Sequence, residues 1–112
     1  DATISSVNTT GYYTKIGNLV TVNIYNAGAN ITAAGTGTAQ INGLPFTVAN
    51  GNGYYSTVTF GHTNMCTTQI DSYAAINTNF CVVVQAGTIT TAVFATGNPK
   101  YMMMSLTYMT SQ

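Results

Sequence analysis

Charged residues are almost absent from this chain of 112 residues. It has two Lys, two Asp and one His, it has neither Glu nor Arg, and charged residues make up 4% of the sequence. Soluble domains usually carry about a quarter charged residues. Acid–base catalysis needs positioned ionisable groups, and few are present here. We therefore expect a structural or binding protein rather than an enzyme.

The same scarcity excludes several partners. Two Lys cannot neutralise enough phosphates for useful nucleic-acid affinity. The chain lacks the run of about 18 apolar residues that a membrane-spanning helix needs. Its glycine-rich stretches at 35–37 and 51–53 lack the G-K-[ST] ending of a phosphate loop, so no nucleotide cofactor is expected. With zero net charge and 46% hydrophobic residues, the chain is expected to associate with copies of itself.

Catalytic constellations would have to use the single histidine, His62. A Ser-His-Asp triad would need Asp1 or Asp71 to orient it, and no G-x-S-x-G motif is present. A glycosidase needs two carboxylates around one bond, and Asp1 is terminal. A pair of His62 with a cysteine remains conceivable, but no cationic neighbour is expected to activate the thiol. We predict no catalytic residues.

Two cysteines, Cys66 and Cys81, leave three alternatives. They are buried free thiols, one disulfide, or ligands of a metal together with His62, although a structural zinc site normally has four ligands. The run Met102–Met104 could suggest a soft-metal site. In a strand, however, Met103 points away from its two neighbours, so core or subunit packing is the better prediction. We expect no metal.

The dominant residues, Thr, Val, Ile, Tyr and Gly, favour β-structure. Residues 18–26 alternate, with Val20, Val22 and Ile24 on one face. They follow residues 12–16 across Gly17-Asn18, a tight-turn dipeptide, so the two segments predict a hairpin. Further strands are predicted at 38–42, 54–63, 80–86, 88–96 and 101–109. Residues 27–37 are predicted to form a loop or a weak edge strand and residues 50–53 a loop, and Pro45 argues against a central strand over 44–48.

Residues 80–86 and 101–109 are apolar on both faces, and such strands must bury both. We expect about eight to ten strands, which indicates one all-β domain over 1–112, an antiparallel, jelly-roll-like β-sandwich. A sandwich core covers only one face of each strand. An identical subunit is the expected cover for the other, and its contact candidates are Val83, Tyr101, Met103 and Met109.

A recognition site is predicted at residues 50–55, where Asn50 and Asn52 precede Tyr54 and Tyr55. Exposed rings beside amides suit neutral sugars. The alternative is that one tyrosine lies in the core and the other under a loop. His62 is a further candidate, or a plain polar loop residue.

Lys15 lies in the first predicted hairpin strand. It is expected to be hydrogen-bonded, or paired with Asp71 of its own or a neighbouring chain, because an unpaired buried charge is costly.

Three segments resemble the C-terminal tip domains of bacteriophage tail and head fibres. Residues 11–24 are similar to the family's opening, which carries a G-x-Y-T-K-I-G-N-x-V hairpin, and residues 41–47 are similar to the segment with its G-L-P-F corner. Residues 105–108 stand where the closing strand ends in G-T-Y, with Leu106 in place of the usual Gly.

The resemblance implies a homotrimeric β-sandwich at the C-terminal end of a longer fibre protein in the virion. Such a tip would bind a glycan or protein receptor on the host cell. A trimerisation or capsid-decoration domain with a purely structural role is the alternative.

Overall fold

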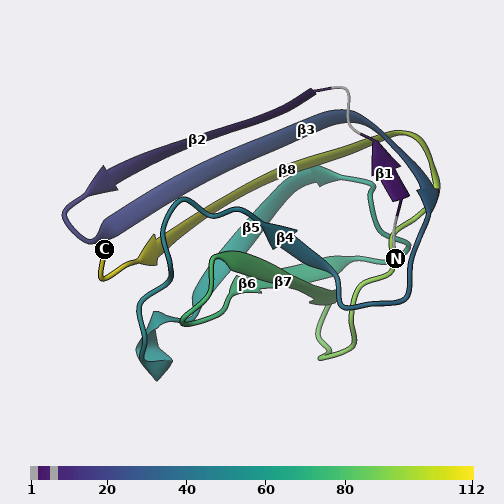
Figure 1. The fold of residues 1–112 in the computed structure, drawn as a ribbon. Coiled ribbons are helices and arrows are strands. Elements are labelled where there is room, and N and C mark those ends of the chain that lie inside the picture. The colour runs from purple at the N-terminus through teal and green to yellow at the C-terminus, as the bar shows by residue number, and fades with distance from the viewer. Residues whose placement is uncertain (1–2, 6–7) are drawn as a thin grey trace.

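A computed structural model describes residues 3–5 and 8–112, with side chains from Thr10 onward. The described residues fold into eight strands and one short 3-10 turn, with no α-helix among them (Figure 1). The expected all-β class is therefore confirmed. The elements in chain order are β1 (Thr3–Ser5), β2 (Asn8–Ile16), β3 (Leu19–Ala33), β4 (Gln40–Asn42), η1 (Asn52–Tyr54), β5 (Ser56–Thr63), β6 (Ile70–Ala74), β7 (Phe80–Gln85) and β8 (Gly97–Met109).

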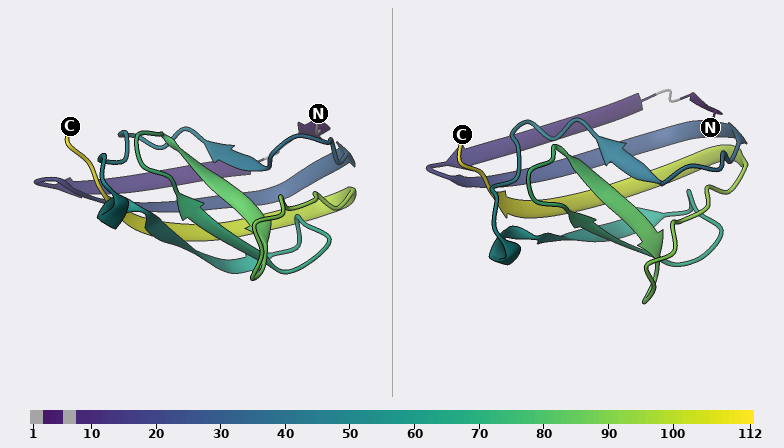
Figure 2. Two further views of the ribbon diagram at one scale, coloured as in Figure 1. Left: turned by 90° about the horizontal axis from the view of Figure 1, so that it is seen from below. Right: turned by 60° about the horizontal axis from the view of Figure 1, so that its bottom comes forward.

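The strands form one antiparallel sheet in the order β1-β3-β8-β5-β6-β7-β4, and β2 pairs with β3 alongside β1. This sheet curls over itself, so that β4, β6 and β7 lie across from the long strands β3 and β8 (Figures 1 and 2). The pairing of the described strands is continuous and is not divided into two separate sheets. The curl creates an inner face that holds the core and an outer face that lies open.

The predicted hairpin is confirmed. Strands β2 and β3 pair from Asn8↔Ala27 to Ile16↔Leu19, and Gly17 has the positive φ of 59° that its turn requires. The expectation of a loop or weak edge over 27–37 is wrong for its first part, because β3 continues to Ala33 and is paired on both sides there. Tertiary partners on β1 and β8 hold this weakly patterned segment in a strand, with Ile31 paired to Gly97.

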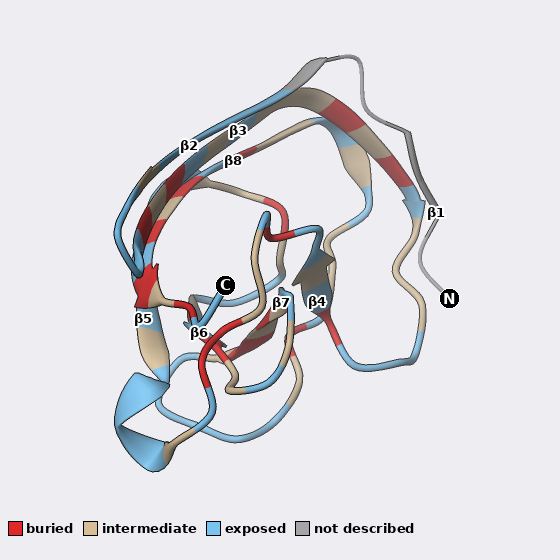
Figure 3. Cartoon of the chain, turned by 60° about the vertical axis from the view of Figure 1, so that its left-hand side comes forward, coloured by how far each residue is buried: buried red, intermediate tan, exposed pale blue. Residues whose placement is uncertain are grey.

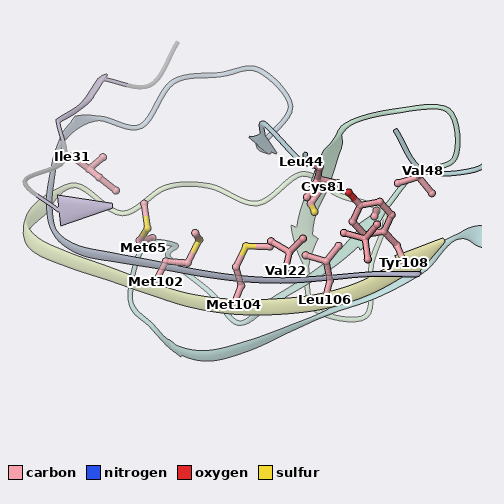
Figure 4. Packing of buried hydrophobic residues seen from close by; sticks show 12 residues of the cluster. Val22, Ile31, Leu44, Val48, Met65, Cys81, Met102, Met104, Leu106 and Tyr108 are labelled. Atoms are coloured by element: carbon pink, nitrogen blue, oxygen red, sulfur yellow. The ribbon is translucent and has the colours of Figure 1, made fainter. Parts of the chain in front are cut away.

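The core lies on the inner face of the curl (Figures 3 and 4). Strand β8 supplies four alternate buried side chains, as its pattern predicted, and β3 supplies Val20, Val22 and Ile31. The four from β8 are Met102, Met104, Leu106 and Tyr108. Alternation places every second residue inside, so Met103 points to the outer face.

Strand β7 corrects one prediction. Val83 is only 3% exposed and packs in a core cluster with Ala39 and Ala92 of its own chain, so it is not available for subunit contact. The segment after β7 folds back along it, with Ala92 N donating to the Val83 carbonyl at 3.1 Å. The strand predicted over 88–96 is reduced to single bridges at Thr91 and Phe94.

Candidate ligand-binding surface

The outer face of the sheet carries a shallow groove of about 570 Å³ across β2, β3, β8 and β5. We call it the outer groove. Its side chains are aromatic, thioether, amide and hydroxyl groups. They belong chiefly to Thr10, Tyr12, Asn23, Tyr25, Thr59, Met103 and Ser105, with Gly61 at one side.

Strand register brings these residues together. Tyr25 on β3 lies opposite Met103 on β8. Asn23 lies opposite Ser105 of β8 and, on its other side, opposite Tyr12 of β2. Because residues two apart on a strand share a face, both rows open onto the same surface.

On the β5 side of the outer groove, Gly61 adds no side chain to the wall. The register of β5 against β8 shifts between Phe60 and Thr63, and Gly61 lies within this irregularity. A Cβ atom at Gly61 would stand 3.6 Å from the Cβ of Met103. Without that atom, the flank of the Met103 side chain is left open.

The lining of the outer groove is chemically suited to a neutral ligand. Tyr12 is 71% exposed, Tyr25 44% and Met103 43%, so their apolar faces are accessible. None of the described lining side chains carries a formal charge. Amides and hydroxyls beside accessible rings give hydrogen bonds and stacking without ion pairs.

The predicted residues at 50–55 lie together before β5. Residues Asn52–Tyr54 form the 3-10 turn η1. Tyr54 and Tyr55 are both exposed, so the alternative that places one of them in the core is wrong. The Tyr55 ring lies 6.1 Å from the ring of Tyr73 on β6.

His62 lies at the other end of β5, where it stacks on Tyr101 with ring centroids 5.0 Å apart. The strand that separates it from Tyr55 spans roughly 20 Å. The predicted recognition residues therefore do not form one site. In the sequence, His62 is adjacent to Gly61, which lines the outer groove. Of the subunit-contact candidates, Met103 is exposed and Tyr101 and Met109 are half-buried.

The charged groups are dispersed. Lys15 Nζ donates to the Gly17 carbonyl at 2.6 Å, and Asp71 Oδ2 accepts from Gly87 N at 2.8 Å. The hydrogen-bonded alternative for Lys15 is thus confirmed, and a pair with Asp71 of its own chain is wrong. Asp1 lies outside the described residues.

Cys66 and Cys81 are free thiols, so the disulfide alternative is wrong; Cys81 is buried, as the free-thiol alternative expected, and Cys66 is half-buried. Burial raises the pKa of each thiol to about 11, so both are protonated near neutral pH. Among residues 3–5 and 8–112, no three His, Cys, Asp or Glu side chains are grouped to hold a metal ion. The described part of the chain also contains no helix long and apolar enough to cross a membrane.

Sequence reasoning missed Tyr12, Asn23 and Tyr25 as a ligand surface. The signal was present in the alternation that put Val20 and Val22 inside, because it puts Asn23 and Tyr25 outside. Their meeting with Met103 depends on strand register, which the alternation does not state.

Comparison of the chain with protein-family models, curated proteins and solved structures gave no match.

Proposed function

We propose that this chain is the receptor-binding tip domain of a phage fibre in the virion and that its outer groove binds a neutral glycan of the host surface. The observation that carries the proposal is the outer groove itself, where accessible Tyr12, Tyr25 and Met103 surround Asn23 and Ser105 without a charged side chain. Sugars present apolar ring faces and hydroxyls to such a surface.

The fibre assignment rests on the sequence motifs, and the fold is compatible with them. The hairpin motif coincides with β2 and β3. The G-L-P-F corner crosses the inner face, with Leu44 buried and the Phe46 ring 5.5 Å from that of Tyr13. In the proposed homotrimer, each subunit forms a jelly-roll-like β-sandwich body. Three equivalent weak sites then act together to raise avidity.

The test is binding of the purified chain to an array of neutral hexose, N-acetylhexosamine and deoxyhexose oligosaccharides, followed by titration of the best ligand. Tyr25→Ala is expected to weaken binding about tenfold, because it removes a stacking face. Tyr73→Ala is the control, since Tyr73 is exposed but lies outside the outer groove. Absence of binding to any glycan, or equal affinities for the wild type and Tyr25→Ala, would contradict the proposal.

A structural role as a trimerisation or capsid-decoration domain is the second candidate. An exposed apolar row favours it: Ile16, 74% exposed, lies opposite Leu19, which lies opposite Met109 of β8. Exposed apolar side chains that adjoin one another favour contact with a protein surface.

Light scattering on Leu19→Asp tests this role. If sister chains cover the row, the substitution dissociates the oligomer, whereas the outward-facing Thr14→Asp control, two residue pairs further along the hairpin, perturbs it less. A wild-type chain that is monomeric at all concentrations would contradict both the homotrimer and this second role.

A further inference from the structure

A second hollow lies on the inner side of the curl. It has a volume of about 360 Å³ and lies between β2 and β3 on one side and β4 on the other. We call it the inner cavity. Its apolar lining includes Ile24, Ile41, Phe60, Met65, Phe94 and Met102.

A glycine leaves the inner cavity open at β2. On the inward face of this strand, Tyr13 packs edge-on against Phe46, and Lys15 Nζ lies 5.5 Å from the centroid of the same ring. The next inward position is Gly11, which pairs with Ile24 and lines the cavity. Where Tyr13 and Lys15 cover the corner, Gly11 leaves a gap that faces β4.

The chemistry of the inner cavity differs from that of the outer groove. None of its described lining residues is charged. Gln40 and Asn42 are exposed and carry amides on the β4 side, and Cys66, whose backbone forms a β-bridge with Phe94, also lines the cavity. An apolar interior with a few amides near its opening accepts a neutral molecule that leaves one polar end at the rim.

We propose that the inner cavity binds a neutral, predominantly apolar small molecule with one or two hydrogen-bonding groups at one end. The volume falls in the range of about 300–1,000 Å³ typical of small-molecule sites, and the lining is predominantly apolar with a few polar groups, as such sites usually are. An inserted strand from another copy fits less well, because β4 offers an edge of only three residues, Gln40–Asn42, whereas strands usually pair over about five or six.

Methionine methyl groups report which site is filled. The chain has five methionines; Met65 and Met102 line the inner cavity and Met103 the outer groove. With ¹³C-methyl methionine, titration of neutral N-phenyl-1-naphthylamine is expected to shift Met65 and Met102 and to enhance the probe's fluorescence. Met103 is expected to stay unchanged. A glycan bound in the outer groove would shift Met103 instead, so the two proposals fail or hold separately.

A second experiment closes the opening of the inner cavity at Gly11. Gly11 has no positive φ, and a Cβ there would meet Ile24 Cγ1 at an ordinary 3.8 Å, so the backbone accepts a side chain. Gly11→Phe is expected to weaken probe binding at least tenfold, whereas Thr14→Phe, on the outer face of the same strand, leaves it unchanged.

Three results would overturn the proposal. They are shifts confined to Met103 or absent from all five methyl groups, equal probe affinity of the folded Gly11→Phe variant, and inner-cavity methyl groups that move only when the chain self-associates. If Gly11→Phe does not fold, the methyl shifts of the wild-type chain decide alone.

Discussion

The hydroxyl of Tyr108 makes two hydrogen bonds to the backbone of Phe46. It donates to the Phe46 carbonyl at 2.9 Å and accepts from the Phe46 N–H at 3.2 Å. Tyr108 lies on β8 and is only 1% exposed, while Phe46 belongs to the G-L-P-F corner. One buried side chain thus satisfies both backbone groups of a non-strand residue and fastens the corner across the inner face.

Tyr108→Phe is expected to lower the free energy of unfolding by about 1–3 kcal/mol, because it leaves the N–H and carbonyl of Phe46 without their partner. Tyr73→Phe is the control, since Tyr73 lies on the exposed side of β6. Urea denaturation of both variants measures the difference. Equal stabilities would show that water replaces the lost hydroxyl at Phe46.

The buried hydroxyl of Ser72 contrasts with the doubly hydrogen-bonded hydroxyl of Tyr108. It is buried on β6, and its Oγ has no hydrogen-bond partner among the described residues. Ser72→Ala removes an unsatisfied polar atom, so the free energy of unfolding is expected to stay equal or to rise by about 1 kcal/mol.

The matched control for Ser72 is Thr110→Val, which removes a buried hydroxyl that accepts a hydrogen bond from Gln112 N at 3.1 Å. This variant is expected to lose stability in the same denaturation assay. A marked loss in Ser72→Ala would mean that Ser72 Oγ is bonded in solution.

Stability is expected to fall at alkaline pH. Cys81 is fully buried, and burial raises the pKa of its thiol from 9.0 to about 11. The folded chain therefore holds this proton more tightly than the unfolded chain. The stability that the protonated Cys81 thiol contributes is fully present below pH 9 and is lost as pH rises from 9 through about 11. Its size is at most about 3 kcal/mol.

Denaturation of the wild type and Cys81→Ala across pH 8–11 checks this slope, and Cys81→Ala is expected to flatten it. Cys66→Ala is the comparison, because burial also raises the pKa of the half-buried Cys66. Tyr108 adds to the slope above pH 10, since burial raises its pKa, partly offset by its hydrogen bond to Phe46. The same slope in Cys81→Ala as in the wild type would exclude Cys81 as the cause.

Gly51 supports the turn that carries Tyr54. Its φ is 138°, and a Cβ there would meet Tyr54 Cδ2 at 3.1 Å. Gly51→Ala is therefore expected to cost about 1 kcal/mol or more in the free energy of unfolding. Gly53→Ala is the control, because Gly53 has no positive φ and a Cβ there would meet no described atom within 4 Å. Equal melting temperatures for the two variants would contradict this account.

Local pattern predicted much of the fold because it acts between neighbours in the chain. Alternation located the inward residues of β3 and β8, and Gly17-Asn18 located the turn between β2 and β3. Local pattern did not predict the strand over residues 27–33, because this strand depends on partners in β1 and β8. Local pattern also did not predict that Val83 is buried within its own chain, because the segment after β7 folds back over that strand.

The candidate sites depended on longer-range geometry. The sequence offered Tyr55 and His62 as separate recognition candidates, and whether they meet depends on the fold: β5 separates them by its length. Tyr25 and Met103, far apart in the chain, meet because β3 pairs with β8 in one register.

The sequence by itself determined the β class, the hairpin, the inward face of β8 and the scarcity of charge, because each follows from residue type and spacing along the chain. Only the tertiary structure decided that the sheet curls, that Gly11 leaves an opening opposite β4, and that Tyr12, Tyr25 and Met103 share one outer groove. The physical reason is that alternation fixes which face of a strand is buried, whereas it does not say which distant strands become neighbours or distinguish pairings that differ by two residues.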